Sequence, residues 1–350
     1  MFSSTAHEPG LAARGEHVHD RPMPDRRRAA ATGHAAARLE PLRRALQRPD
    51  SGIRSFLVAS GAGLVFEHHR PDVAAATPQP VNSVTKSVLG MLVGIALQQG
   101  VFAGLRQPVA DFLPELRAPD VPARARAITL EHLLTMTAGF AWDEHKVDRC
   151  LLAACARFAA PGERLRFIVG RELAHPPGQR FNYDSHAAHL LSIALARAAS
   201  QRTDRYAEAM LLQPLGIHDW QWETDEDGVP FGGRGLALRP RDMLSIGLLM
   251  LRRGQWEGRQ LVSAGYLHAS ARAHSAGGWP MQRARYGYLW WHAEDAHDAA
   301  ACFAAGFGGQ FIFVEPRRNL VAAVTADPDK TPKHVRRLMA EHVLPAACPT

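Results

Sequence analysis

Apolar and polar residues alternate in short runs at both ends of this chain. Residues 53–59 and 64–67 predict two strands of a hairpin, because Ser60-Gly61-Ala62-Gly63 places turn residues between them. Four further short apolar runs, separated by turn residues, predict strands near the C-terminus at 286–292, 299–304, 311–314 and 320–325. A last helix is expected at 331–343.

The middle of the chain follows a helical period instead. In the stretch after Ser83, apolar residues recur every three or four positions, and Gly100 and Gly104 predict its end. Further helices are expected at 108–116, 129–136, 186–200, 204–213 and 240–253. Strands at both ends around a helical middle predict an α+β fold, in which an antiparallel sheet is built from both chain ends, is flanked by helices and carries a large helical insertion.

The domain organisation follows from the same pattern. Residues 1–45 are rich in Ala, Arg, His and Pro with little periodicity, which predicts a poorly ordered N-terminal arm that becomes helical near 35–46. Residues 46–350 are expected to form one domain with a substantial core. Its α/β part comprises 46–82 and 284–350, and its mainly helical part comprises 83–283.

The chain is basic, with a formal charge of +7 and a pI of about 9.6. Such an excess is found in proteins that bind nucleic acids or anionic membranes. Here 37 of the 41 basic residues are arginine, and they are scattered along the chain apart from Arg26-Arg27-Arg28 in the arm. We interpret the charge as a bias in composition and expect no nucleic-acid partner.

Neither a metal nor another cofactor is expected. The four cysteines are too few for a disulfide scaffold in 350 residues, and no two of them form a Cys-x-x-Cys pair. Histidine pairs such as His186 and His189 have no third ligand at a suitable spacing.

No membrane span is expected either, because no run of 18 apolar residues is free of charged and polar breaks. No apolar segment follows the basic start of the chain, so no secretory signal is visible and a cytoplasmic location is the default expectation. A misassigned start codon would leave a periplasmic location open.

One charged side chain, Lys86, lies between Asp72 and Arg106, and it follows Ser83 by three residues. Residues three apart share a face of a helix. An ammonium is costly to bury without a partner, and an apolar setting lowers the pKa of a lysine. Because a serine hydroxyl needs a base to become a good nucleophile, Ser83 and Lys86 are a candidate nucleophile and base. No other Ser-x-x-Lys occurs in the chain.

Two more motifs follow in order, Tyr183-Asp184-Ser185 ahead of a helix and Ala304-Ala305-Gly306 between two strand-like runs. With these, residues 53–345 resemble the penicillin-recognising serine hydrolase superfamily, closest to class C β-lactamases, related esterases and nylon-oligomer (6-aminohexanoate) hydrolases. Ser83-Val84-Thr85-Lys86 matches the first motif of that superfamily and Tyr183-Asp184-Ser185 its Tyr-x-Asn/Ser motif. Ala304-Ala305-Gly306 stands where many members have Lys-Thr-Gly or His-x-Gly.

Tyr183 is a second candidate base, and a nearby Lys86 cation would favour its phenolate, so the two would titrate as a coupled unit. The N–H of Ser83 at a helix N-terminus and the N–H of Phe307 are expected to form an oxyanion hole. Gly306 would let the backbone approach the substrate closely.

Two neighbours of Tyr183 complete the predicted site. Ser185 is expected to hydrogen-bond Lys86 or the substrate. Asp184 is grouped with the substrate-site residues, with a solvated side chain as the alternative.

The third motif departs from the superfamily, because Ala304 replaces the basic residue that class A and class C β-lactamases present to the carboxylate of the drug. Small esters and short amides are therefore the expected substrates.

The favoured function is a cofactor-independent serine hydrolase that works through an acyl-enzyme on Ser83. Two alternatives remain open: a catalytically silent β-lactamase-fold protein with a binding or regulatory role, and a true β-lactamase or DD-peptidase. An α/β-hydrolase is not expected, because the chain has no Gly-x-Ser-x-Gly.

Overall fold

The structure, a computed structural model, describes residues 38–61, 63–144, 158, 160–293, 301–327 and 335–346. Most of the expected N-terminal arm lies outside these residues, as do 299–300 of one expected strand and 331–334 of the expected last helix.

Within the described residues, seven strands form one antiparallel sheet in the order β2-β1-β12-β11-β10-β9-β8. The strands are β1 (Ile53–Ser60), β2 (Gly63–His69), β8 (Ala284–Tyr286), β9 (Trp291–Ala293), β10 (Cys302–Gly306), β11 (Gln310–Glu315) and β12 (Leu320–Ala326). The first strand of the chain lies beside the last one, which confirms the predicted antiparallel sheet built from both chain ends.

The prediction of one strand over residues 286–292 is wrong. The chain turns between β8 and β9, where the N–H of Gly287 donates to the carbonyl of Trp290 over 2.7 Å and Leu289 has a φ of 58°. Every residue from Tyr286 to Trp291 that has a side chain is apolar and buried. A run of this kind has no alternation that would mark the turn.

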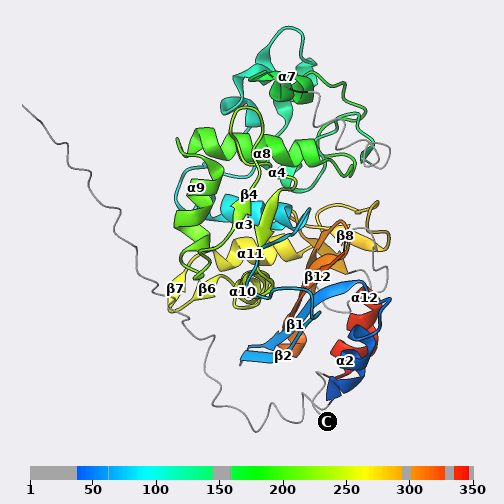
Figure 1. Cartoon of the computed structure of the whole chain (residues 1–350). Helices are drawn as coiled ribbons and strands as arrows, with labels where there is room; N and C mark the ends of the chain where they lie inside the picture. The colour runs from blue at the N-terminus through cyan, green and yellow to red at the C-terminus, as the bar shows by residue number, and fades with distance from the viewer. Residues whose placement is uncertain are drawn as a thin grey trace, which may run out of the picture.

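Helices cover both faces of the sheet and form a second region beyond it (Figure 1). The helices are α2 (Glu40–Leu46), α3 (Val84–Gln98), α4 (Leu130–Leu134), α7 (Glu163–Val169), α8 (Ser185–Ala198), α9 (Thr203–Ala207), α10 (Pro240–Leu251), α11 (Ala264–Ala271), α12 (Val335–Leu338) and α13 (Leu344–Ala346). Figure 1 shows α10 on one side of the sheet and α2 beside α12 on the other.

Shorter elements also lie in the described parts of the insertion and near the C-terminus. The 3₁₀-helices are η2 (Val109–Asp111), η3 (Pro114–Arg117), η4 (Ala123–Ala127) and η6 (Pro316–Arg318), and the π-helices are η5 (Glu208–Leu212) and η8 (Met339–Val343). Two small sheets pair β3 (Gln79–Pro80), β5 (Leu236–Leu238) and β4 (Gln221–Trp222), and β6 (Gln255–Trp256) with β7 (Arg259–Gln260).

The expected helix at 108–116 is two 3₁₀-turns, η2 and η3, and the one at 204–213 is α9 continued by the π-turn η5. Helices α7 and α11 were not predicted. Each is eight residues or shorter and too brief to show a clear period.

Helix α3 lies at the centre of the molecule, and every residue from Val84 to Ala96 is buried. Two glycines allow this close packing. A Cβ on Gly90 would lie 3.0 Å from the carbonyl oxygen of Tyr288, and a Cβ on Gly94 would lie 2.4 Å from the ring of Tyr266. The helix that begins after Ser83 is thus fixed from all sides.

Helix α2 crosses the expected boundary between the arm and the domain at residue 45. Leu42 and Leu46 are buried in the core, and α2 packs against η8. The division of the chain at this residue stays a prediction.

In the described part of the chain, no helix combines the length and the apolar character that crossing a membrane requires.

Candidate active site

Ser83 stands at the N-cap position of α3, yet its side chain makes no capping hydrogen bond. Its Oγ lies 2.9 Å from the Nζ of Lys86, one helical turn on. The residue before it, Asn82, has a φ of 50°, in the left-handed region where asparagine is tolerated better than most residues. The backbone therefore turns sharply just before Ser83, and the Ser83 hydroxyl contacts the amine of Lys86 instead of capping the helix.

Lys86 is buried to 1% exposure inside the helical region. Besides Ser83, its Nζ donates to the Oγ of Ser185 over 2.8 Å and to the carbonyl oxygen of Gly233 over 2.7 Å. It also lies 4.8 Å from the centre of the Tyr183 ring. Residues from three separate segments thus surround one amine, and hydrogen bonds replace the water that it loses on burial.

Tyr183 is held among aromatic rings. Its ring stacks on Trp291 at 5.8 Å and meets Trp279 and Tyr286 edge-on at 6.1 and 6.3 Å. Burial, with a smaller effect of Tyr183, raises the pKa of Tyr286 well above its ordinary value, so Tyr286 remains a neutral phenol. The aromatic cluster fixes Tyr183 beside the lysine.

The predicted oxyanion donors lie on two segments that touch. A Cβ on Gly306 would lie 2.3 Å from the carbonyl oxygen of Val81, so only glycine lets the end of β10 pass this close to the turn before α3. Asn82 donates its side-chain N–H to the carbonyl of Phe307 over 2.8 Å. Among the described residues, neither the N–H of Ser83 nor that of Phe307 donates to another protein group. The Phe307 side chain is 61% exposed.

Asp184 is not solvated, and its carboxylate accepts three hydrogen bonds within the protein. It is 3% exposed and caps α8, where Oδ1 accepts from the N–H groups of His186 and Ala187. Its Oδ2 accepts from Arg171 over 2.9 Å. This pairing orients the helix that carries Ser185, so we do not retain Asp184 as a substrate contact.

Sequence reasoning missed Glu144, which is 5% exposed and lies against the start of α8. Its Oε1 accepts from the Ser185 hydroxyl over 2.5 Å, and its Oε2 accepts from the N–H of Ser185 over 3.1 Å and from the Trp142 indole over 2.5 Å. A lone glutamate with no motif around it carries no sequence signal.

Sequence reasoning also missed Gly233, whose carbonyl is a partner of Lys86. The pair Gly232-Gly233 was the available signal. A Cβ on Gly232 would lie 2.2 Å from the carbonyl oxygen of Ala188, and one on Gly233 would lie 2.8 Å from that of Ser185. Glycines at both positions therefore let this segment pass directly over α8.

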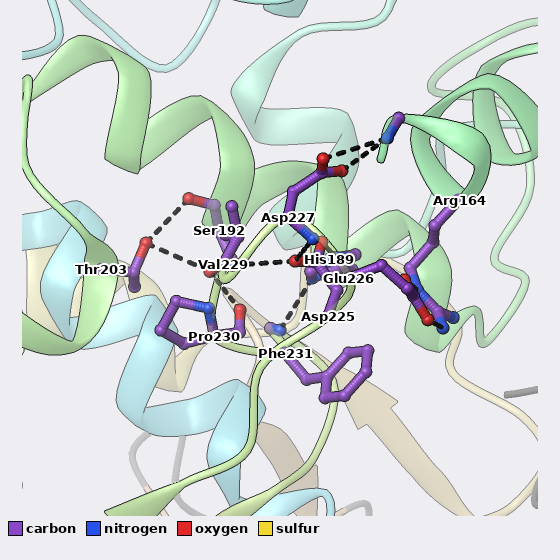
Figure 2. A network of polar contacts seen from close by, with 12 residues as sticks. Arg164, His189, Ser192, Thr203, Asp225, Glu226, Asp227, Val229, Pro230 and Phe231 are labelled. Carbon is purple, nitrogen blue, oxygen red and sulfur yellow. Dashed lines mark hydrogen bonds and ion pairs between the residues drawn. The ribbon is translucent and has the colours of Figure 1, made fainter. Parts of the chain in front are cut away.

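A polar network holds the segment that leads to Gly233 (Figure 2). The Nε2 of His189 donates to Asp225 over 2.8 Å, and the Nδ1 of His189 accepts from the N–H of Gly232 over 3.3 Å. Asp225 also accepts from the N–H groups of Asp227 and Val229. The buried histidine thus ties the loop to α8 just before the carbonyl that meets the lysine.

A cavity of about 680 Å³ opens beside Tyr183 and Glu144. Its walls include Trp142, Phe181 and Trp279, together with the polar residues Arg180 and Asn182. Ser83 and Lys86 do not line the cavity, which adjoins this pair on the side of Tyr183 and is large enough for a small ester or amide. In the part of the chain that the structure describes, no three His, Cys, Asp or Glu residues gather in a way that could hold a metal ion.

The sequence model of the family described as Beta-lactamase matches residues 48–344, most of the chain. The chain belongs to this family, which confirms the predicted superfamily and agrees with the α+β fold.

Among its relatives, the 6-aminohexanoate-dimer hydrolase of Paenarthrobacter ureafaciens is 23% identical over 80% of this chain and 74% of its own length. Esterase EstB of Burkholderia gladioli is 29% identical over 47% of this chain, and the match spans 45% of the esterase. Among solved structures, EstCE1, described as a hydrolase with promiscuous acyltransferase activity, superposes with a TM-score of 0.71 at 18% identity. That match covers 91% of this chain and 99% of EstCE1.

Proposed function

We propose that this protein is a cofactor-independent serine hydrolase that cleaves a small ester or amide through an acyl-enzyme on Ser83. The observation that carries the proposal is the 2.9 Å distance between the buried amine of Lys86 and the hydroxyl oxygen of Ser83. The Ser83 side chain makes no capping hydrogen bond to α3. The family of the chain and the names of its relatives, a 6-aminohexanoate-dimer hydrolase and an esterase, support an activity on amide or ester bonds.

Acylation begins when Ser83 Oγ forms a bond to the substrate carbonyl carbon and neutral Lys86 takes the hydroxyl proton. The electron pair of the C=O double bond moves to oxygen, which accepts hydrogen bonds from the N–H groups of Ser83 and Phe307. When the tetrahedral intermediate collapses, the C–O or C–N bond breaks. The leaving alcohol or amine takes the proton from Lys86, directly or through the Tyr183 hydroxyl.

Deacylation repeats these steps with water. A water molecule attacks the acyl carbon and gives its proton to the Lys86–Tyr183 pair. Ser83 then leaves with that proton, and the carboxylic acid is released. Each group returns to its starting state without a cofactor.

The preferred acyl groups are small and lack the carboxylate that β-lactam drugs carry. Ala304, at the position of the basic residue in the superfamily motif, is fully buried in β10 and offers no charge. The exposed ring of Phe307 favours an apolar acyl group, and Trp142 and Trp279 offer further apolar contacts in a cavity wall that also carries polar side chains.

The test is the hydrolysis of short-chain p-nitrophenyl esters by purified protein. We expect nitrophenol release, its abolition in Ser83→Ala, and covalent labelling of Ser83 by a fluorophosphonate probe. Failure of the wild-type protein to react with either the esters or the probe would support the silent binding role instead. Rapid hydrolysis of a penicillin would support a true β-lactamase.

A further inference from the structure

Glu144 belongs to none of the motifs, yet it is the buried carboxylate that contacts Ser185. Within the described ranges, its side chain accepts three hydrogen bonds, one at Oε1 and two at Oε2. The Oε1 bond takes the hydroxyl hydrogen of Ser185 over 2.5 Å. Because an ionised carboxylate only accepts hydrogen bonds, this contact fixes the direction of the Ser185 hydroxyl.

The fixed direction of the Ser185 hydroxyl determines whether Ser185 accepts a hydrogen bond from Lys86 or donates one to it. With its hydrogen committed to Glu144, the oxygen of Ser185 faces the lysine Nζ, 2.8 Å away, as an acceptor. The carbonyl oxygen of Gly233, 2.7 Å from the same Nζ, is also an acceptor and has no hydrogen to give.

A neutral amine has two N–H hydrogens and one lone pair. When Ser185 and Gly233 each accept one hydrogen, the lone pair is left for a donor, and the Ser83 hydroxyl lies 2.9 Å away. We propose that Glu144 is a positioning residue that, through Ser185, directs the lone pair of Lys86 toward Ser83. This inference rests on the proposed function, since it assigns a direction to the proposed proton transfer.

Glu144→Gln tests the inference because its effect on Ser185 can be predicted. The two N–H donors at Oε2, from Ser185 and the Trp142 indole, would hold the amide oxygen of the glutamine at that position. The amide NH₂ would then face Ser185 Oγ and donate to it. The Ser185 hydroxyl would have to turn its hydrogen toward Lys86 and would occupy the lone pair that Ser83 needs.

The expected result is a fall in kcat of about 10- to 100-fold in E144Q, part of the 10²–10⁴-fold that a general base contributes. KM should stay within about twofold, because the change acts on proton transfer rather than on substrate binding. Ser185→Ala should lower kcat less than E144Q, because it removes an acceptor without adding a competing donor. The double variant E144Q/S185A should therefore be more active than E144Q alone.

The recovery in the double variant is the decisive readout, because a merely structural role of Glu144 predicts further loss when Ser185 is also removed. A double variant no more active than E144Q would overturn the inference, as would an E144Q enzyme within about twofold of the wild-type kcat. Glu172→Gln is the matched control. Glu172 lies on the segment paired with residue 141, its side chain is exposed, and its loss should leave kcat unchanged.

Thermal unfolding verifies that each variant is folded. If E144Q does not fold, Glu144→Asp replaces it: a carboxylate withdrawn by one methylene releases the Ser185 hydroxyl, which can then turn its hydrogen toward Lys86, so the same order of activities is expected. The proposed function is tested separately. Fluorophosphonate should still label E144Q at Ser83, more slowly than wild type, whereas an unlabelled wild-type protein would refute the hydrolase itself.

Discussion

Asn82 donates its side-chain N–H to the carbonyl oxygen of Phe307 over 2.8 Å, which joins residues 225 positions apart in the chain. The next residue after Asn82 is the proposed nucleophile, and Phe307 supplies the second proposed oxyanion donor. One hydrogen bond thus connects the start of the central helix α3 to the end of β10. In the proposed oxyanion hole, we expect this contact to set the spacing of the two backbone N–H groups.

Substitution of Asn82 should separate its two roles, the hydrogen bond to Phe307 and the left-handed backbone with a φ of 50°. Asn82→Gly removes only the hydrogen bond, so we expect kcat for p-nitrophenyl acetate to fall about tenfold with one oxyanion donor displaced. Asn82→Ala also strains the backbone and should lower the free energy of unfolding by about 1 kcal/mol more than the glycine variant. Ester kinetics and urea unfolding measure the two effects. Equal stability of the two variants would contradict the backbone role.

Gly306→Ala should abolish ester hydrolysis. The added Cβ would lie 2.3 Å from the carbonyl oxygen of Val81, and backbone on both sides leaves nothing flexible to move. The end of β10 must shift away from Ser83, and Phe307 shifts with it. Gly104→Ala is the control, because a Cβ there meets nothing within 4 Å. Activity of the Gly306→Ala enzyme within tenfold of wild type would show that the two segments need not touch.

The contact between Ser83 and Lys86, the proposed catalytic pair, was predictable because the relationship is local. A helix brings residues three apart onto one face, so Ser83 and Lys86 are neighbours whatever surrounds them. Glu144 and Gly233 were not predictable. Glu144 reaches Ser185 across 41 residues, and Gly233 reaches Lys86 across 147. A backbone carbonyl also leaves no trace in the sequence, since every residue has one.

The strands of the sheet were predictable because their signals are also local in the sequence. Strands β1, β2, β11 and β12 are short apolar runs bounded by turn residues, and the structure has them within two residues of the expected ends. The turn between β8 and β9 escaped detection because burial on all sides removes the polar residues that usually mark a turn. Asp184 was misjudged for the opposite reason, because a capping aspartate and a solvated one look alike in sequence.

Removal of Asp225 should weaken both the fold and the activity. Its carboxylate accepts from His189, Asp227 and Val229, and Asp225→Ala would leave these donors without an acceptor. We expect a loss on the order of 3 kcal/mol in the free energy of unfolding. The kcat should also fall, because His189 no longer holds Gly232 and the neighbouring carbonyl drifts from Lys86. Asp120→Ala, at an exposed position, is the control for loss of a carboxylate.

The buried His186 should make the protein less stable in acid. It packs against Trp142 and Phe167 at ring distances of 4.6 and 5.8 Å, and burial lowers its pKa to about 3, from an ordinary value of 6.5. As the pH falls below 6.5, the unfolded chain takes up a proton at this histidine and the folded protein does not. The free energy of unfolding should therefore decrease as pH falls from 6.5 toward 3, by up to about 1.4 kcal/mol per pH unit.

His186→Phe should remove this acid sensitivity, because phenylalanine keeps the aromatic packing and takes up no proton. Between pH 7 and pH 4.5, the wild-type protein should lose about 2–3 kcal/mol more of its free energy of unfolding in urea than the variant does. The matched control is His268→Phe, at an exposed position, which should keep the wild-type slope. Parallel pH profiles for wild type and His186→Phe would mean that His186 is protonated as readily in the folded protein as in the unfolded chain.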